Sequence, residues 1–171
     1  ARPDARRVLD LGTGSGALLL AVLAQLEQAE GLGIDRSGAA LAVAQANAEA
    51  LELGARARFA LGDWHADGWT QGLGTFDLIL CNPPYVETDA ALDAQVAAFE
   101  PATALFAGPE GLDDYRVLIP QLRALMNPQA RVILEIGANQ GDAVSALAAA
   151  AGFAVELRRD LGGRARALVL G

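Results

Sequence analysis

The feature that most restricts the fold of this chain is a glycine-rich loop between a short apolar run and a helical pattern. The apolar run is Arg7–Leu11, the loop is Gly12-Thr13-Gly14-Ser15-Gly16, and apolar residues then recur at helical spacing as far as Leu26. This order of strand, tight turn and helix is a βα unit. Glycine in such a turn lets the backbone approach a ligand closely, so the loop predicts a binding site at the carboxyl end of the first strand.

Strand-like and helix-like segments alternate along the rest of the chain. The predicted strands are 7–11, one ending at 34–35, 57–61, 76–81, 131–136, 153–159 and 165–170; the predicted helices are 18–26, one capped by Ser37 and ended by Gly54, 112–126 and 141–151, and the segment 89–99 allows a short helix. The βαβ crossovers imply parallel strands, whereas the short turn at Gly162-Gly163 predicts an antiparallel pair at the sheet edge. We therefore predict a single α/β domain over 1–171, a doubly wound, Rossmann-like, seven-stranded and mainly parallel sheet with helices on both faces.

Charge and composition narrow the functions open to the chain. Its formal net charge of −8 argues against a broad nucleic-acid surface, because such binding depends on Lys and Arg at phosphates. Cys81 is the only cysteine, so neither an internal disulfide nor a cysteine-based zinc cluster is expected, and no other group of residues has metal-site spacing. The sequence contains no signal-peptide pattern and no apolar run of the roughly 20 residues that a membrane helix needs, which predicts a cytoplasmic protein without membrane contact.

Asp35 ends the second predicted strand, nineteen positions after Gly16. In doubly wound folds a carboxylate at this place binds ribose hydroxyls. Gly12, Gly14 and Ala17 also satisfy a loose dinucleotide-binding fingerprint, so a nicotinamide or flavin enzyme is an alternative on this segment alone. A further alternative is that the loop and Asp35 bind no ligand, so that the glycines only make a tight turn and the carboxylates are solvated.

The tetrapeptide Asn82-Pro83-Pro84-Tyr85 follows the fourth predicted strand and favours a methyltransferase over a nicotinamide enzyme. The Asn82 side-chain oxygen and the Pro83 carbonyl can accept both hydrogens of one planar NH2 group and aim its lone pair outward. Tyr85 can pack on that planar group. The alternative is a proline-rich turn that only ends the strand.

Several segments together resemble the HemK/PrmC family of release factor N5-glutamine methyltransferases, over almost the whole chain. The resembling segments are Val8–Gly16, Gly62-Asp63-Trp64, Phe76–Ile79, Asn82–Val86, Glu100-Pro101 with Ala104-Leu105, Gly111-Leu112 with Tyr115, and Leu134–Gly137 with Gln140-Gly141. The last three sets resemble this family and not methyltransferases in general. Members of the family carry an additional helical N-terminal domain, whereas Ala1 stands six residues before the first strand here.

The resemblance implies a class I methyltransferase fold that uses S-adenosylmethionine without a metal, releases S-adenosylhomocysteine, and modifies the GGQ glutamine of peptide-chain release factors. The implied cofactor-binding residues are Asp10, Gly12, Thr13, Gly14, Ser15, Gly16, Asp35, Asp63, Trp64 and Asn82. The implied catalytic residues are Asn82, Pro83 and Tyr85, and the acceptor would contact Asn82, Pro83, Pro84, Tyr85 and Glu100. The alternative for Glu100 is an ordinary carboxylate on the surface that does not contact the acceptor.

Two other functions are compatible with these patterns. The substrate of a DNA or RNA amino methyltransferase would present the same planar NH2 group to the Asn-Pro-Pro-Tyr turn. A non-catalytic binding module could retain the fold without turnover.

Outside the motifs, His65 lacks a visible orienting partner for a general base, and Cys81 is expected in the core. Asp113 and Asp114 are expected to favour a helix start through the helix dipole.

Overall fold

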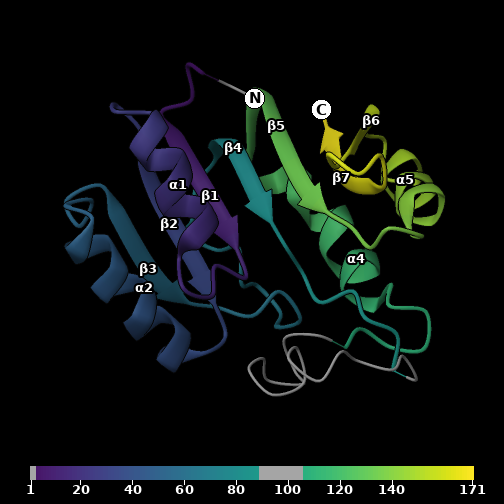
Figure 1. Cartoon of the computed structure of the whole chain (residues 1–171), viewed down its shortest axis with the longest axis horizontal. Helices are drawn as coiled ribbons and strands as arrows, with labels where there is room; N and C mark the ends of the chain where they lie inside the picture. Colours follow the sequence, from purple (N-terminus) through teal and green to yellow (C-terminus); the bar gives the residue numbers. More distant parts are fainter. Residues whose placement is uncertain (1–2, 89–105) are drawn as a thin grey trace.

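The computed structural model describes residues 3–88 and 106–171 of the chain and contains a sheet of seven strands (Figure 1). The elements are β1 Arg7–Leu11, α1 Ala17–Gln25, β2 Glu30–Asp35, α2 Gly38–Ala50, β3 Ala57–Leu61, β4 Phe76–Cys81, α4 Asp113–Leu118, the 3-10 helix η2 Ile119–Leu125, β5 Met126–Glu135, α5 Gly141–Ala150, β6 Val155–Arg159 and β7 Ala165–Leu170. The predicted bounds of β1, β3, β4 and β7 are confirmed. No helix in the described ranges is both long and apolar enough to cross a membrane.

The strand order is β3-β2-β1-β4-β5-β7-β6. Strands β1 to β5 pair in parallel, and β7 is antiparallel to both β5 and β6. The predicted antiparallel edge pair is therefore confirmed, with the last strand of the chain inserted between β5 and β6. Because β1 lies between β2 and β4, their carboxyl ends meet near the middle of one edge of the sheet.

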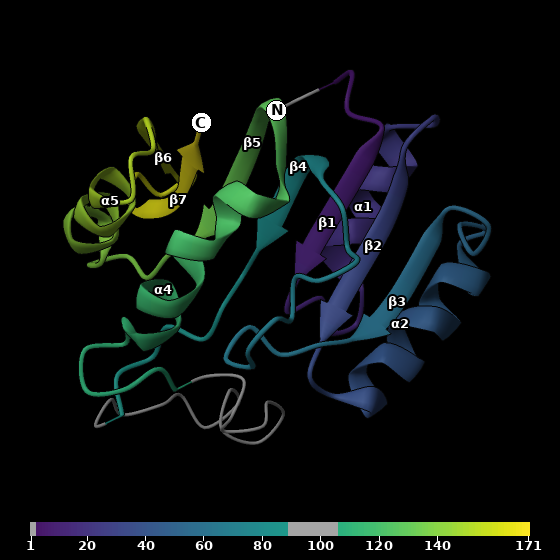
Figure 2. The same ribbon diagram turned by 180° about the vertical axis from the view of Figure 1, so that it is seen from behind.

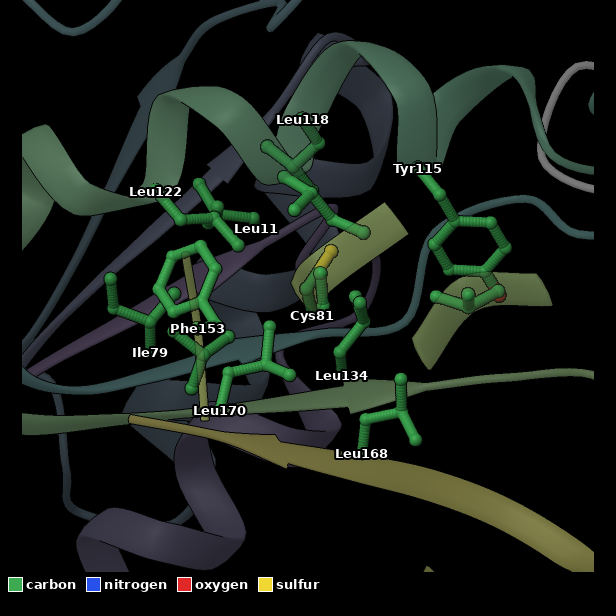
Figure 3. Packing of buried hydrophobic residues seen from close by; sticks show 14 of the residues in the cluster. Leu11, Ile79, Cys81, Tyr115, Leu118, Leu122, Leu134, Phe153, Leu168 and Leu170 are labelled. Atoms are coloured by element: carbon green, nitrogen blue, oxygen red, sulfur yellow. The ribbon is translucent and has the colours of Figure 1, made fainter. Parts of the chain in front are cut away.

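Consecutive strand residues point to opposite faces of the sheet and join two apolar clusters. On β1, Val8 belongs to a cluster with residues of α1 and α2, whereas Leu9 and Leu11 belong to a cluster with α4, η2 and α5. Figures 1 and 2 show α1 and α4 on opposite faces of the sheet. The second cluster includes the aromatic rings of Tyr115 and Phe153 (Figure 3). The prediction of helices on both faces is confirmed.

The predicted helix over 112–126 is wrong in extent. The structure has a short α-helix, α4, which continues into the 3-10 helix η2, and Pro120 lies in the first turn of η2. Proline lacks the N–H group that an α-helical hydrogen bond requires, so the α-helical pattern stops near this residue. The chain then enters β5 at Met126, five residues before the predicted start of that strand.

Only the N-terminal end of α2 agrees with the prediction. The Ser37 hydroxyl accepts a hydrogen bond from the Ala40 N–H at 3.2 Å, which confirms the predicted N-cap. The helix ends at Ala50, and Glu52 takes the positive φ of 59°, so Gly54 does not end it. A non-glycine residue at positive φ is uncommon, so the composition of this turn did not reveal it.

Asp10 is a buried acid on β1. Its Oδ2 accepts a hydrogen bond from the Thr13 hydroxyl at 2.7 Å, while Oδ1 has no hydrogen-bond partner within the described part of the chain. Burial raises the pKa of Asp10 from 3.8 to about 7, against the lowering effect of the Thr13 hydrogen bond. The folded protein therefore binds a proton at this carboxyl more tightly than the unfolded chain does.

This raised pKa predicts a pH-dependent cost of folding. The contribution of Asp10 to stability is fully present below pH 3.8 and is lost as the pH rises through about 7. Compared with Asp10→Asn, which keeps an acceptor for Thr13, the wild type should lose on the order of 4 kcal/mol of unfolding free energy across this window. Urea unfolding of both proteins at a series of pH values measures the difference. A difference that does not change with pH would show that the Asp10 carboxyl titrates normally.

Candidate active site

The register of the parallel strands gathers the predicted motifs at one edge of the sheet. Leu11 of β1 pairs with Ile34 of β2 and with Cys81 of β4, and Asp35 pairs with Leu61 of β3. The segments that directly follow these residues are the glycine loop, the end of β2, the turn at 62–64 and the Asn-Pro-Pro-Tyr tetrapeptide. Segments that are far apart in sequence thus lie beside one another.

A cleft of about 840 Å³ opens at this edge. Its volume is in the range of small-molecule sites in proteins. The cleft is lined by Gly12, Thr13, Gly14, Ser15, Ala17, Leu18, Asp35, Arg36, Ser37, Ala40, Val43, Gly62, Asp63, Trp64, Asn82 and Pro84. The lining therefore combines loop backbone, two carboxylates, one indole ring and the start of the predicted acceptor motif.

The glycine loop is attached to the end of β2 through its backbone. The N–H groups of Gly12 and Thr13 both donate to the Ile34 carbonyl at 2.9 Å. Gly12 has a φ of 70°, and a Cβ atom there would stand 3.3 Å from Cη2 of Trp64. Gly14 has a φ of 54° with open space where a Cβ atom would project. A side chain at either position would strain the loop and occupy the space next to the cleft wall.

Asp35 stands on the rim of the cleft and holds two neighbouring segments together. Its Oδ2 accepts from the Gly14 N–H at 2.9 Å, and its Oδ1 accepts from the Ser37 N–H at 2.8 Å. A carboxylate oxygen has more than one lone pair, so both oxygens retain capacity for a ligand hydroxyl. Asp10 and Gly16 are buried behind the loop and do not line the cleft.

The turn after β3 forms another wall. Asp63 Oδ1 accepts from the His65 N–H at 2.9 Å, which shapes the turn. The Trp64 indole N–H donates to Asp114 Oδ1 at 2.7 Å, and the His65 Nε2 lies 2.9 Å from the same oxygen. The premise that His65 lacks an orienting partner is therefore wrong, although His65 does not line the cleft. Asp114 also lies in the first turn of α4, as expected, but it is buried rather than solvated.

The Asn-Pro-Pro-Tyr segment leads from β4 along the cleft. Asn82 is exposed and lines the cleft together with Pro84, whereas Pro83 is buried and Tyr85 is partly buried. The Tyr85 hydroxyl donates to Glu135 Oε1 at 3.5 Å. Burial raises the pKa of Tyr85 above its ordinary value, and the neighbouring Glu135 charge raises it further. Tyr85 is thus a neutral donor at physiological pH rather than a phenolate base.

Gln140 fixes the far end of this segment. Its Nε2 donates to the carbonyl oxygens of Tyr85 at 2.9 Å and Gly111 at 3.1 Å, and its Oε1 accepts from the Gly137 N–H at 3.0 Å. Gly111 is packed so closely that a Cβ atom there would lie 2.3 Å from the Tyr85 carbonyl oxygen. One buried amide side chain thus joins the segments after β4, before α4 and after β5.

Sequence reasoning missed the contacts of Asp114 with Trp64 and His65 and those of Gln140 with Tyr85 and Gly111. Asp114 and Gln140 lie in or beside the late segments that carry the family resemblance, and this was the only available signal.

Cys81 is buried in the core as predicted, and burial raises the pKa of its thiol well above the usual range. Glu100, a predicted acceptor contact, and the optional helix over 89–99 lie outside the described residues. Within the described ranges no three His, Cys, Asp or Glu residues form a group that could hold a metal ion.

Comparison with known proteins identifies the kind of domain that carries this cleft. The release factor glutamine methyltransferase of Rhodospirillum rubrum is 46% identical over 166 residues, covering 95% of this chain and 50% of that protein. The enzyme of the same name from Caulobacter vibrioides is 48% identical over 155 residues, covering 88% of this chain and 52% of that protein. The predicted resemblance is confirmed, and the chain spans about half the length of these curated relatives.

Comparison with solved structures supports the fold. An O-methyltransferase family protein from Burkholderia thailandensis superposes with a TM-score of 0.71 at 18% identity, covering 98% of this chain and 51% of that one. The predicted class I methyltransferase fold is confirmed. A family described as a methyltransferase domain matches residues 3–148. The match covers most of the chain, from before β1 into α5, and the chain therefore belongs to this methyltransferase-domain family.

Proposed function

We propose that the chain transfers a methyl group from S-adenosylmethionine to the side-chain amide nitrogen of a protein glutamine, and that the acceptor is the GGQ glutamine of peptide-chain release factors. The observation that carries the proposal is the position of Asn82, which directly follows β4 and lines the cleft beside Gly12 of the glycine loop. The names of the curated relatives supply the class of acceptor.

The volume of the cleft and the polar groups that line it suit S-adenosylmethionine. The open space at Gly14 leaves the backbone accessible to the methionyl part, and the Asp35 carboxylate on the rim suits the ribose hydroxyls. Asp63 and the indole of Trp64 form the wall assigned to adenine. Asp63 Oδ1 is used within its own turn, which leaves Oδ2 to accept from an adenine amino group. Asp10 supports the loop from behind through Thr13.

Asn82 and Pro83 provide two acceptors for one amide group. The Asn82 side-chain oxygen and the Pro83 carbonyl would hold both hydrogens of the glutamine NH2 and turn its lone pair towards the cleft. The hydrogen bond from Tyr85 to Glu135 and the bonds from Gln140 fix the segment before the acceptor arrives. Tyr85 and Pro84 would contact the planar amide from the side. Glu100 stays a predicted contact of the acceptor.

The reaction requires no covalent intermediate on the protein. S-adenosylmethionine supplies a methyl group on a positively charged sulfur, which leaves as a neutral thioether. The chain positions the acceptor nitrogen in line and accepts its N–H groups, and these two contributions lower the barrier mainly through orientation and electrostatic support. The surplus proton of the methylated nitrogen passes to water.

The proposal sets the partner and the compartment of the protein. Its partner is a release factor, its compartment is the cytoplasm in which release factors act, and S-adenosylhomocysteine is the second product. The net charge of −8 does not favour the long phosphate chain of a nucleic-acid substrate. No metal is required, because the sulfonium itself activates the methyl group.

Mass spectrometry tests the proposal directly. The chain is incubated with S-adenosylmethionine and either an intact release factor or a short peptide containing Gly-Gly-Gln, and unmodified DNA and RNA are assayed in parallel with labelled cofactor. We expect one added methyl group on the glutamine of the protein or the peptide. Labelling of nucleic acid with no modified glutamine would overturn the assignment of the acceptor in favour of an amino methyltransferase of nucleic acids.

The cofactor assignment predicts a specific effect at Asp35. Asp35→Ala should weaken S-adenosylmethionine binding by about 1–3 kcal/mol, the range for a lost hydrogen bond to a charged group. Glu30→Ala is the matched control, because Glu30 is an exposed acid at the opposite end of the same strand. Isothermal titration calorimetry compares the two variants. Equal affinities, or preferential binding of NAD by the wild type, would remove Asp35 and the glycine loop from the cofactor site.

The acceptor assignment predicts that Asn82→Ala separates binding from turnover. The rate of methyl transfer should fall by about 100-fold or more, because a positioned contact in the transition state is lost. Cofactor affinity should change little, since the glycine loop and Asp35 remain. Asn139→Ala is the matched control, because it makes the same substitution at an exposed position after β5. Parallel loss of affinity and rate in Asn82→Ala would assign Asn82 to the cofactor pocket.

A further inference from the structure

Asp114 joins α4 to the cleft wall formed after β3. It is a buried acid with 7% of its surface exposed, and it lies 50 residues along the chain from Trp64. Its Oδ1 accepts the Trp64 indole N–H at 2.7 Å and lies 2.9 Å from the His65 Nε2. One carboxylate from a different element thus holds Trp64 of the cleft wall and also contacts the next residue, His65, which does not line the cleft.

The hydrogen bond to Asp114 determines which edge of the Trp64 ring faces the cleft. Indole has a single N–H donor, and a hydrogen bond from it to a carboxylate is stronger than one between neutral groups. At the other edge of the ring, Cη2 lies 3.3 Å from the position that a Cβ atom on Gly12 would take. The ring is therefore fixed between Asp114 and the backbone of the glycine loop. Gln121 adds a hydrogen bond to the Trp64 carbonyl at 3.1 Å.

We propose that Asp114 is a positioning residue for the cofactor, which acts by holding the Trp64 ring in its binding orientation before the ligand arrives. The inference rests on the proposed function, in which Trp64 contacts the adenine. Because Asp114 occupies the indole N–H, Trp64 presents only carbon atoms to the ligand and recognises it by ring contact. Without Asp114 the ring would rotate in the free protein and would have to be ordered when the ligand binds. This cost would weaken the affinity by roughly 3- to 10-fold.

Calorimetric titration with S-adenosylmethionine and S-adenosylhomocysteine tests the role of Asp114. Asp114→Ala should bind both ligands about 3- to 10-fold more weakly than the wild type, with kcat at saturating cofactor unchanged. Asp114→Asn keeps an oxygen acceptor for Trp64 and should restore most of the affinity. Asp113→Ala is the matched control, because this exposed neighbour in the same turn pairs with Arg116 at 3.0 Å and not with the wall. It should bind as the wild type does.

A double-mutant cycle separates positioning from a general effect on folding. Trp64→Phe removes the indole N–H and keeps an aromatic ring, so adding Asp114→Ala to this variant should weaken binding no further. His65→Ala removes the other partner of Asp114 and should leave the affinity unchanged. Additive losses in the cycle, or equal affinities of Asp114→Ala and the wild type, would overturn the positioning role of Asp114 and leave the proposed function unaffected. Failure of the wild type to bind S-adenosylmethionine would reject the proposed function and this inference together.

Discussion

The carbonyl oxygen of Ile34 is the point on which the arrangement of the cleft depends. It accepts the N–H groups of both Gly12 and Thr13 at 2.9 Å, so the first turn of the glycine loop is attached to the end of the neighbouring strand. Asp35 follows directly and accepts the Gly14 N–H at 2.9 Å. The loop therefore takes its shape from β2 as much as from its own sequence, and Trp64 can pack closely against Gly12 because glycine has no side chain.

The strands were predictable because buried parallel strands form short apolar runs that end at polar or glycine residues. The run Phe76–Cys81, for example, ends at two prolines that cannot continue a sheet. The helix ends were less predictable. Pro120 lies inside a pattern that otherwise reads as continuous helix, and the chain responds with a 3-10 helix rather than a break. Periodicity does not distinguish these two outcomes, since both keep the apolar residues Ile119, Leu122 and Leu125 buried.

The site was predictable to the extent that its residues are the last residue of a strand or directly follow a strand. The glycine loop, Asp35, the turn at 62–64 and Asn82 share this property, and parallel register alone brings them together. Asp114 and Gln140 act across 50 and 55 residues of sequence, on Trp64 and Tyr85. Nothing local distinguishes a buried acid or amide from an exposed one at a helix start. Their partners become visible only when α4 and the turn after β5 are packed against the sheet.

The two halves of the chain divide the work at the cleft. The first half supplies the groups that line it, through β1, β2, β3 and β4. The second half supplies side chains that hold two of those groups: Asp114 accepts a hydrogen bond from Trp64, and Gln140 donates one to the carbonyl of Tyr85 at the end of the Asn-Pro-Pro-Tyr segment. In the proposed function, a planar amide requires the Asn82 and Pro83 oxygens at fixed positions, and the hydrogen bonds of Gln140 would help to keep them there. The segments around Gly111 and Gln140 resemble the release factor glutamine methyltransferases in particular, and they contact Tyr85 of the Asn-Pro-Pro-Tyr segment rather than the glycine loop.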